Sequence, residues 1–95
     1  MTDSYPRTYN DANYSQVSTT TTLVVKATPG TVHRLIVSGG AATNGDISLV
    51  NDSTTVVKIL AGYVGGGVID VGIHFATNIK VTLADAGDEV TVVWT

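Results

Sequence analysis

Apolar and polar residues alternate along most of the chain from about residue 16 onward. In one example, Ile79, Val81 and Leu83 alternate with Lys80 and Thr82. Such alternation is typical of strands with one buried face. Comparable β-rich runs cover residues 17–27, 32–37, 47–51, 55–60, 68–73, 79–83 and 90–94. Turn-forming residues separate these runs, and no stretch shows the three-to-four-residue apolar spacing of a helix.

This pattern predicts an all-β domain, a small antiparallel β-sandwich of seven or eight short strands. Either a jelly-roll or an immunoglobulin-like topology would fit the pattern, which leaves that choice open. The Thr-rich run 17–27 is interpreted as one strand, with Leu23, Val25 and Ala27 on a single face and a turn at Pro29-Gly30.

Residues 1–15 have no helix or strand period and are interpreted as an extended arm that precedes a β-sandwich domain at 16–95. Three of the four tyrosines lie in this arm. One interpretation is a frayed terminus. The alternative is a docking arm, because Tyr and Arg often anchor interfaces. The residues predicted to contact a partner are Tyr5, Pro6, Arg7, Tyr9 and Tyr14.

Composition narrows the classes of function. Ninety-five residues suffice for one domain with a thin core. Only five residues are Lys or Arg, they are scattered, and the net charge is −3, which argues against nucleic acid as a partner. The chain has no cysteine and no apolar run long enough to span a bilayer, and its first residues do not resemble a secretory signal. We therefore expect synthesis in a cytoplasm and no membrane partner.

Candidate chemistry is sparse. His33 and His74 lie within strand-like runs and are interpreted as histidines that are exposed or hydrogen-bonded within the sheet. The carboxylates fall mainly in predicted turns, where Asp is a common turn former, and residues 85–88 lack the ligand spacing of a hand-type calcium loop. The glycines at 65–67 lack the strand, helix and Lys-Ser or Lys-Thr of a phosphate-binding loop. The sequence thus predicts no catalytic, metal-binding or cofactor-binding residues, and no enzyme.

Several segments resemble small virion structural proteins of tailed bacteriophages, of the head decoration (cement) type. The resemblance covers about four fifths of the chain. It rests on TTTTLVVKATPG (19–30), LIV (35–37), GDISLVNDS (45–53), IHFATNIKV (73–81) and DEVTVVW (88–94).

The resemblance implies a homo-oligomer, most often a trimer, although a dimer also fits. It would sit on the outer capsid surface, with the major capsid protein as its partner. The arm would supply the contacts to the capsid or to a neighbouring subunit. The alternatives are a phage fibre or spike protein and a carbohydrate-binding module. A row of exposed aromatic residues would favour the carbohydrate-binding module, but Tyr63, Phe75 and Trp94 are widely spaced.

Overall fold

Eight β-strands and no helix make up the part of the chain that the computed structural model describes, which is residues 12–18, 20–37, 42–63, 67–85 and 87–95. The strands are β1 (Asn13–Val17), β2 (Leu23–Lys26), β3 (Gly30–Val37), β4 (Ile47–Asn51), β5 (Thr54–Ile59), β6 (Val68–Phe75), β7 (Ile79–Leu83) and β8 (Val90–Trp94). The predicted all-β sandwich is confirmed.

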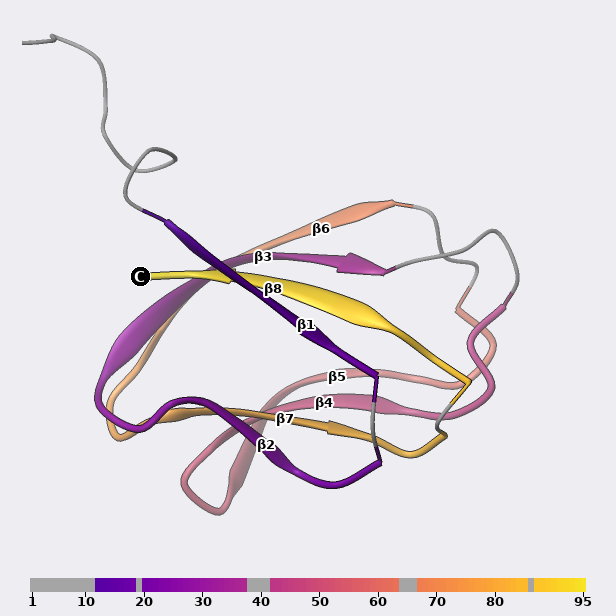
Figure 1. The fold of residues 1–95 in the computed structure, drawn as a ribbon, viewed down its shortest axis with the longest axis horizontal. Helices are drawn as coiled ribbons and strands as arrows, with labels where there is room; N and C mark the ends of the chain where they lie inside the picture. The colour runs from indigo at the N-terminus through magenta and orange to yellow at the C-terminus, as the bar shows by residue number, and fades with distance from the viewer. Residues whose placement is uncertain (1–11, 19, 38–41, 64–66, 86) are drawn as a thin grey trace, which may run out of the picture.

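The strands form two four-stranded antiparallel sheets that are stacked as two layers (Figure 1). The first sheet has the order β1-β8-β3-β6 and the second has the order β2-β7-β4-β5. The first strand therefore pairs with the last, the second with the seventh, the third with the sixth and the fourth with the fifth. This nested pairing is the strand order of a jelly roll, which decides between the two topologies that the sequence left open.

The core lies between the two sheets and is built by the alternation seen in the sequence. In β7 the buried residues are Ile79, Val81 and Leu83, while Lys80 and Thr82 are partly exposed. The core cluster consists of Val17, Val32, Leu35, Val37, Ile47, Leu49, Ile59, Phe75, Ile79, Val81, Leu83, Val90 and Val92. Most members are the β-branched residues Val and Ile, which pack well on pleated surfaces.

The prediction of one strand over 17–27 is wrong. The chain leaves the first sheet after Val17 and enters the second at Leu23, so the run contributes to two layers. Val17 is buried, whereas Leu23 is 40% exposed and Ala27 lies beyond the end of β2. Threonine-rich β-branched sequence favours extended backbone throughout, and therefore gives no local signal of the crossing between sheets.

The first strand begins at Asn13 and pairs with β8 along its whole length, from Asn13 opposite Trp94 to Val17 opposite Val90. The structure therefore places residues 13–15, which the sequence assigns to the arm, in the first sheet. Trp94 donates a hydrogen bond from Nε1 to Ser15 Oγ at 2.9 Å, which adds a side-chain link between the two strands.

Candidate interaction surface

Of the residues predicted to contact a partner, Tyr14 lies within the described structure. Tyr5, Pro6, Arg7 and Tyr9 lie outside the described residues. Tyr14 is on the edge strand β1 and is 63% exposed. Its ring is therefore available for a contact outside the domain.

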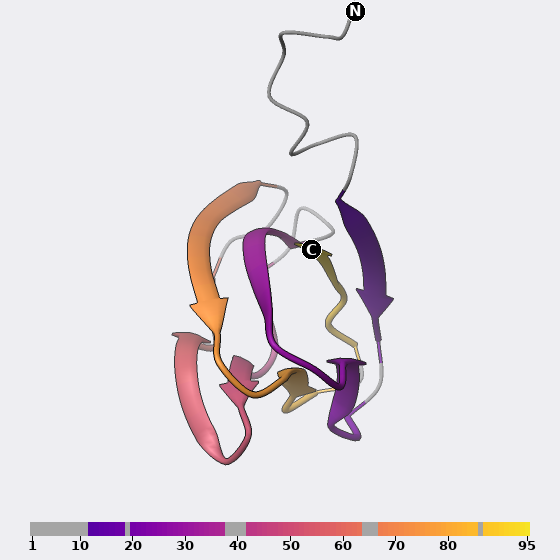
Figure 2. The same ribbon diagram turned by 90° about the vertical axis from the view of Figure 1, so that its left-hand side faces the viewer.

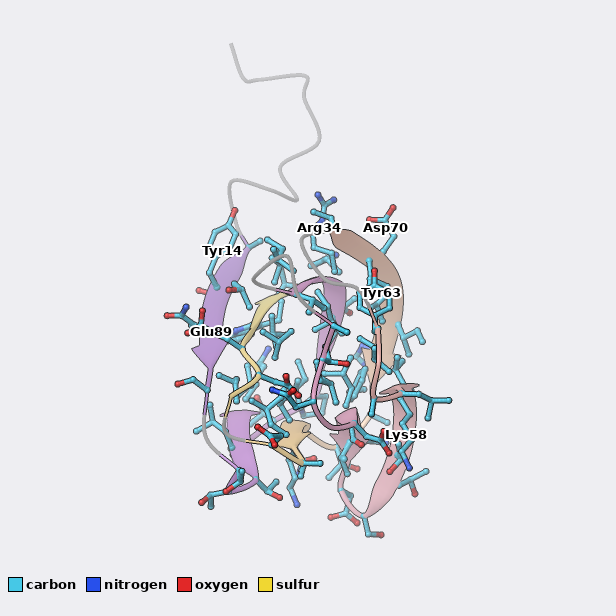
Figure 3. All side chains as sticks on the ribbon, turned by 90° about the vertical axis from the view of Figure 1, so that its right-hand side faces the viewer. Tyr14, Arg34, Lys58, Tyr63, Asp70 and Glu89 are labelled. Carbon is cyan, nitrogen blue, oxygen red and sulfur yellow. The ribbon has the colours of Figure 1, made fainter. Side chains whose placement is uncertain are left out.

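Tyr14 begins a row of residues that crosses the outer face of the first sheet. It pairs with Val93, Val93 pairs with Arg34, and Arg34 pairs with Asp70 on the opposite edge strand. Direct cross-strand partners point to the same side of a sheet. Figure 3 shows Tyr14 at one edge of this face, with Arg34 and Asp70 toward the other edge. The row thus combines an aromatic ring, a cation and an anion on one face.

Val93 is the buried residue in the middle of this row. The residue is only 2% exposed, yet it does not belong to the core cluster that contains its neighbour Val92. Adjacent strand residues point to opposite faces, so Val93 lies on the outer face between its partners Tyr14 and Arg34. The sequence carried a signal for this arrangement, because three consecutive apolar residues, 92–94, cannot all face the core.

The first sheet also carries both histidines, His33 on β3 and His74 on β6. His33 Nε2 is hydrogen-bonded to Thr95 Oγ1 at 3.0 Å, and His74 Nδ1 is hydrogen-bonded to Thr31 Oγ1 at 3.3 Å. The prediction of strand histidines that are exposed or hydrogen-bonded within the sheet is therefore confirmed. The register shifts between Val32 and Arg34 on β3, so that His33 is an extra residue relative to β8.

Polar side chains at one end of the sandwich hold three connections together. Asp88 is 6% exposed, and its carboxylate oxygens accept hydrogen bonds from the backbone amides of Asn44 and Gly45, each at 2.9 Å. Thr43 Oγ1 accepts a hydrogen bond from the Tyr63 amide at 3.1 Å. These bonds join the β3–β4 connection to the β7–β8 and β5–β6 connections. The polar side chains are therefore used as acceptors for backbone amides.

At the other end of the sandwich, the side chains of Asn51 and Asn78 also accept hydrogen bonds from backbone amides. Asn51 Oδ1 accepts a hydrogen bond from the Thr77 amide at 2.9 Å, and Asn78 Oδ1 accepts one from the Asp52 amide at 2.7 Å. Lys80 Nζ donates to the Asp52 carbonyl at 3.1 Å. Asp52 lies in the two-residue β4–β5 turn with a φ of 56°, which Asp tolerates better than most residues. These contacts agree with the turn-forming role predicted from residue type.

Among the residues that the structure describes, no group of three or more His, Cys, Asp or Glu is placed to hold a metal ion. Nor does any helix in these segments have the length and apolar character needed to cross a membrane. No protein-family model, curated protein or solved structure matches the chain.

Proposed function

We propose that this protein is a non-enzymatic structural protein of a tailed-bacteriophage virion, a capsid decoration (cement) protein. In this proposal it binds the outer surface of the major capsid lattice as a homo-oligomer, with a trimer favoured, and stabilises the head after synthesis in the host cytoplasm. The observation that carries the proposal is the jelly-roll strand order. This order recurs in viral capsid domains and in lectins. The support is an analogy of fold, to which the sequence resemblance adds.

The use of the polar side chains also supports a structural role. The oxygens of Asp88, Asn51 and Asn78 accept hydrogen bonds from backbone amides in connections. Side chains engaged in this way stabilise the connections between strands. The Asp46 carboxylate likewise accepts a hydrogen bond from the Ala61 amide at 2.8 Å. A domain whose polar side chains stabilise its own connections suits a structural subunit that is held in an assembly.

The proposed mechanism is clamping without chemistry. Each contact with the capsid would remove apolar surface from water, at roughly 25 cal/mol per Å². An oligomer bound through several copies at once would multiply weak contacts through effective concentration. Tyr14 lies on β1, the strand that follows the proposed arm, and its side chain is on the outer face of the first sheet.

Rebinding to capsids stripped of decoration tests this function. The purified protein is expected to co-sediment with such capsids. A variant that lacks residues 2–11 is expected to melt at nearly the same temperature but to lose most of its capsid binding. This deletion keeps β1 intact, which a deletion through residue 15 would not. Wild-type protein that stays in the supernatant would contradict the function, and unchanged binding by the deletion variant would contradict the role of the arm.

The second candidate function is glycan binding, as in a spike or a carbohydrate-binding module. The row of Tyr14, Arg34 and Asp70 favours it, because an exposed ring can stack on a sugar while charged groups on the same face bind its hydroxyls. Calorimetric titration with a panel of oligosaccharides would show binding that is lost in Tyr14→Ala. A flat titration by the wild type would remove this candidate.

A further inference from the structure

Asn44 and Gly45 form the one Asn-Gly pair of the sequence, since every other asparagine precedes Asp, Tyr or Ile. The pair lies in the β3–β4 connection, and Asn44 is exposed. Asparagine is chemically labile, above all before glycine, because a residue without a side chain lets its backbone nitrogen approach the side-chain carbonyl carbon of the asparagine. The chain therefore presents a candidate site of deamidation at this end of the sandwich.

Deamidation at this pair needs no reactant besides water. The Gly45 nitrogen loses its proton to solvent and attacks Asn44 Cγ, so that a new N–C bond forms. The bond from Cγ to Nδ2 breaks, and ammonia leaves with a proton taken from solvent. Water then opens the cyclic imide. Cleavage of the new bond gives aspartate at position 44, and cleavage of the bond from the same nitrogen to the main-chain carbonyl carbon gives isoaspartate.

In the folded domain, Asp88 holds the nitrogen that would attack. The Gly45 amide donates a hydrogen bond to Asp88 Oδ2 at 2.9 Å, and the Asn44 amide donates one to Asp88 Oδ1 at the same distance. Loss of the Gly45 proton would break a charge-assisted hydrogen bond and would place a negative nitrogen beside a buried carboxylate. Both effects oppose the attack. A carboxylate is far too weak a base to remove the amide proton itself.

The packing of the connection requires glycine at position 45. A Cβ added there would lie 2.9 Å from Ala84 Cβ and 3.1 Å from the Asp85 backbone nitrogen, just beyond the end of β7. A larger residue, which would slow the reaction, therefore does not fit without a shift of the backbone. The fold thus keeps the reactive pair, and the contact with Asp88 protects it.

We propose that Asn44 is a deamidation site that Asp88 keeps unreactive in the folded domain, and that it becomes reactive when the β7–β8 connection separates from the β3–β4 connection. Aspartate at position 44 would add a second carboxylate beside Asp88, and isoaspartate would add a methylene to the main chain between the two amides that Asp88 binds. Either product opposes the return of these hydrogen bonds, so the change is irreversible. The inference does not depend on the proposed function.

Rates of deamidation at mildly alkaline pH, well below the melting temperature, test the protection. Peptide mapping by mass spectrometry measures the conversion at position 44, and wild type unfolded in urea gives the rate of the unprotected pair. Folded wild type should react at least about tenfold more slowly, the factor that corresponds to one hydrogen bond to a charged group. Asp88→Ala should recover most of this difference. Asp88→Asn keeps an acceptor but no charge and should fall between the two.

Gly30→Ala separates the local effect of Asp88 from a general loss of stability. Gly30 is the first residue of β3, which begins at the opposite end of the sandwich, the end that faces the viewer in Figure 2. Its added Cβ would lie 2.6 Å from the Thr95 carbonyl oxygen, so this variant is destabilised without a change at Asp88. For each variant, the unfolded fraction from urea denaturation, multiplied by the rate of the unfolded chain, gives the deamidation that global unfolding supplies. Gly30→Ala should not exceed this rate, whereas both Asp88 variants should.

Several results would overturn the proposal. Folded wild type that reacts as fast as the unfolded chain would do so, as would Asp88 variants that react no faster than their unfolded fractions allow. The same excess rate in Gly30→Ala would remove the local role of Asp88. If Asp88→Ala does not fold, Asp88→Asn provides the same comparison.

The melting temperature of converted wild type tests irreversibility. Its additional negative charge allows separation from unconverted protein by anion exchange, and it should melt at a lower temperature. Equal melting would show that the hydrogen bonds to Asp88 return, and would overturn that part of the inference.

Discussion

At the scale of single residues, Asp88 has the clearest structural task. Its carboxylate accepts hydrogen bonds from two backbone amides of the β3–β4 connection while the residue is almost fully buried. Asp88→Ala would leave both amides without this acceptor, which costs about 1–3 kcal/mol for a buried donor. Thermal unfolding should show a melting temperature lower by at least roughly 5 °C. Asp88→Asn retains one acceptor oxygen and should lose less, and the half-buried neighbour Glu89 supplies the control Glu89→Ala. Equal melting of Asp88→Ala and wild type would contradict this role.

Asp52 shows the effect of backbone conformation without side-chain contacts. Its bonds to Asn78 and Lys80 run through its backbone amide and carbonyl, so they survive substitution of the side chain. Its φ of 56° lies in the left-handed region, which costs an ordinary L-residue roughly 1–2 kcal/mol. Asp52→Gly should therefore match or exceed the stability of the wild type in urea denaturation, whereas Asp52→Val should lower it by about that amount. The opposite order would show that the Asp52 side chain matters more than its backbone conformation.

At the scale of elements, β3 starts at Gly30, whose backbone lies against its neighbours without room for a side chain. A Cβ added at Gly30 would lie 2.6 Å from the Thr95 carbonyl oxygen and 3.1 Å from Ile79 Cδ1. Gly30→Ala should therefore displace the start of β3 and destabilise the fold by about 1–3 kcal/mol. Gly67, whose nearest neighbour would be 3.9 Å away, gives the matched control Gly67→Ala, which should be close to neutral. Chemical denaturation of the two variants would test the difference, and similar losses in both would contradict the steric explanation.

The strands are also where prediction from sequence succeeded and where it stopped. Alternation identified strands such as β7 and β8, because a half-buried strand requires a period of two. The turn role of Asp52 followed from residue type. The crossing between β1 and β2 has no such local signature, and the position of Tyr14 in a sheet depends on β8, almost eighty residues later. The partners of Asp88 are likewise distant in sequence, so its hydrogen bonds to the β3–β4 connection could not be derived from spacing.

At the scale of the whole molecule, pairing between distant segments determines the architecture. Among the strands that the structure describes, only β4 and β5 are sheet neighbours that also follow one another in sequence. Each sheet therefore combines strands from the first and the second half of the chain. Because of this pairing, loss of one terminal strand also affects the far end of the chain.

The two ends of the described chain pair with each other as β1 and β8. Two deletions test whether the domain needs β1 to remain folded. Removal of residues 2–11 leaves β1 in place and should shift the melting temperature by only a few degrees. Removal of residues 2–17 takes away β1, the bond from Trp94 to Ser15 and the buried Val17, whose apolar contribution alone is about 1.5–3 kcal/mol. Since small domains are stable by only about 5–15 kcal/mol, this loss should lower the melting temperature by at least 10 °C or prevent folding. Scanning calorimetry of both variants provides the measurement. Equal melting would mean that β8 holds its place without β1, and that the first sheet is sufficient with three strands.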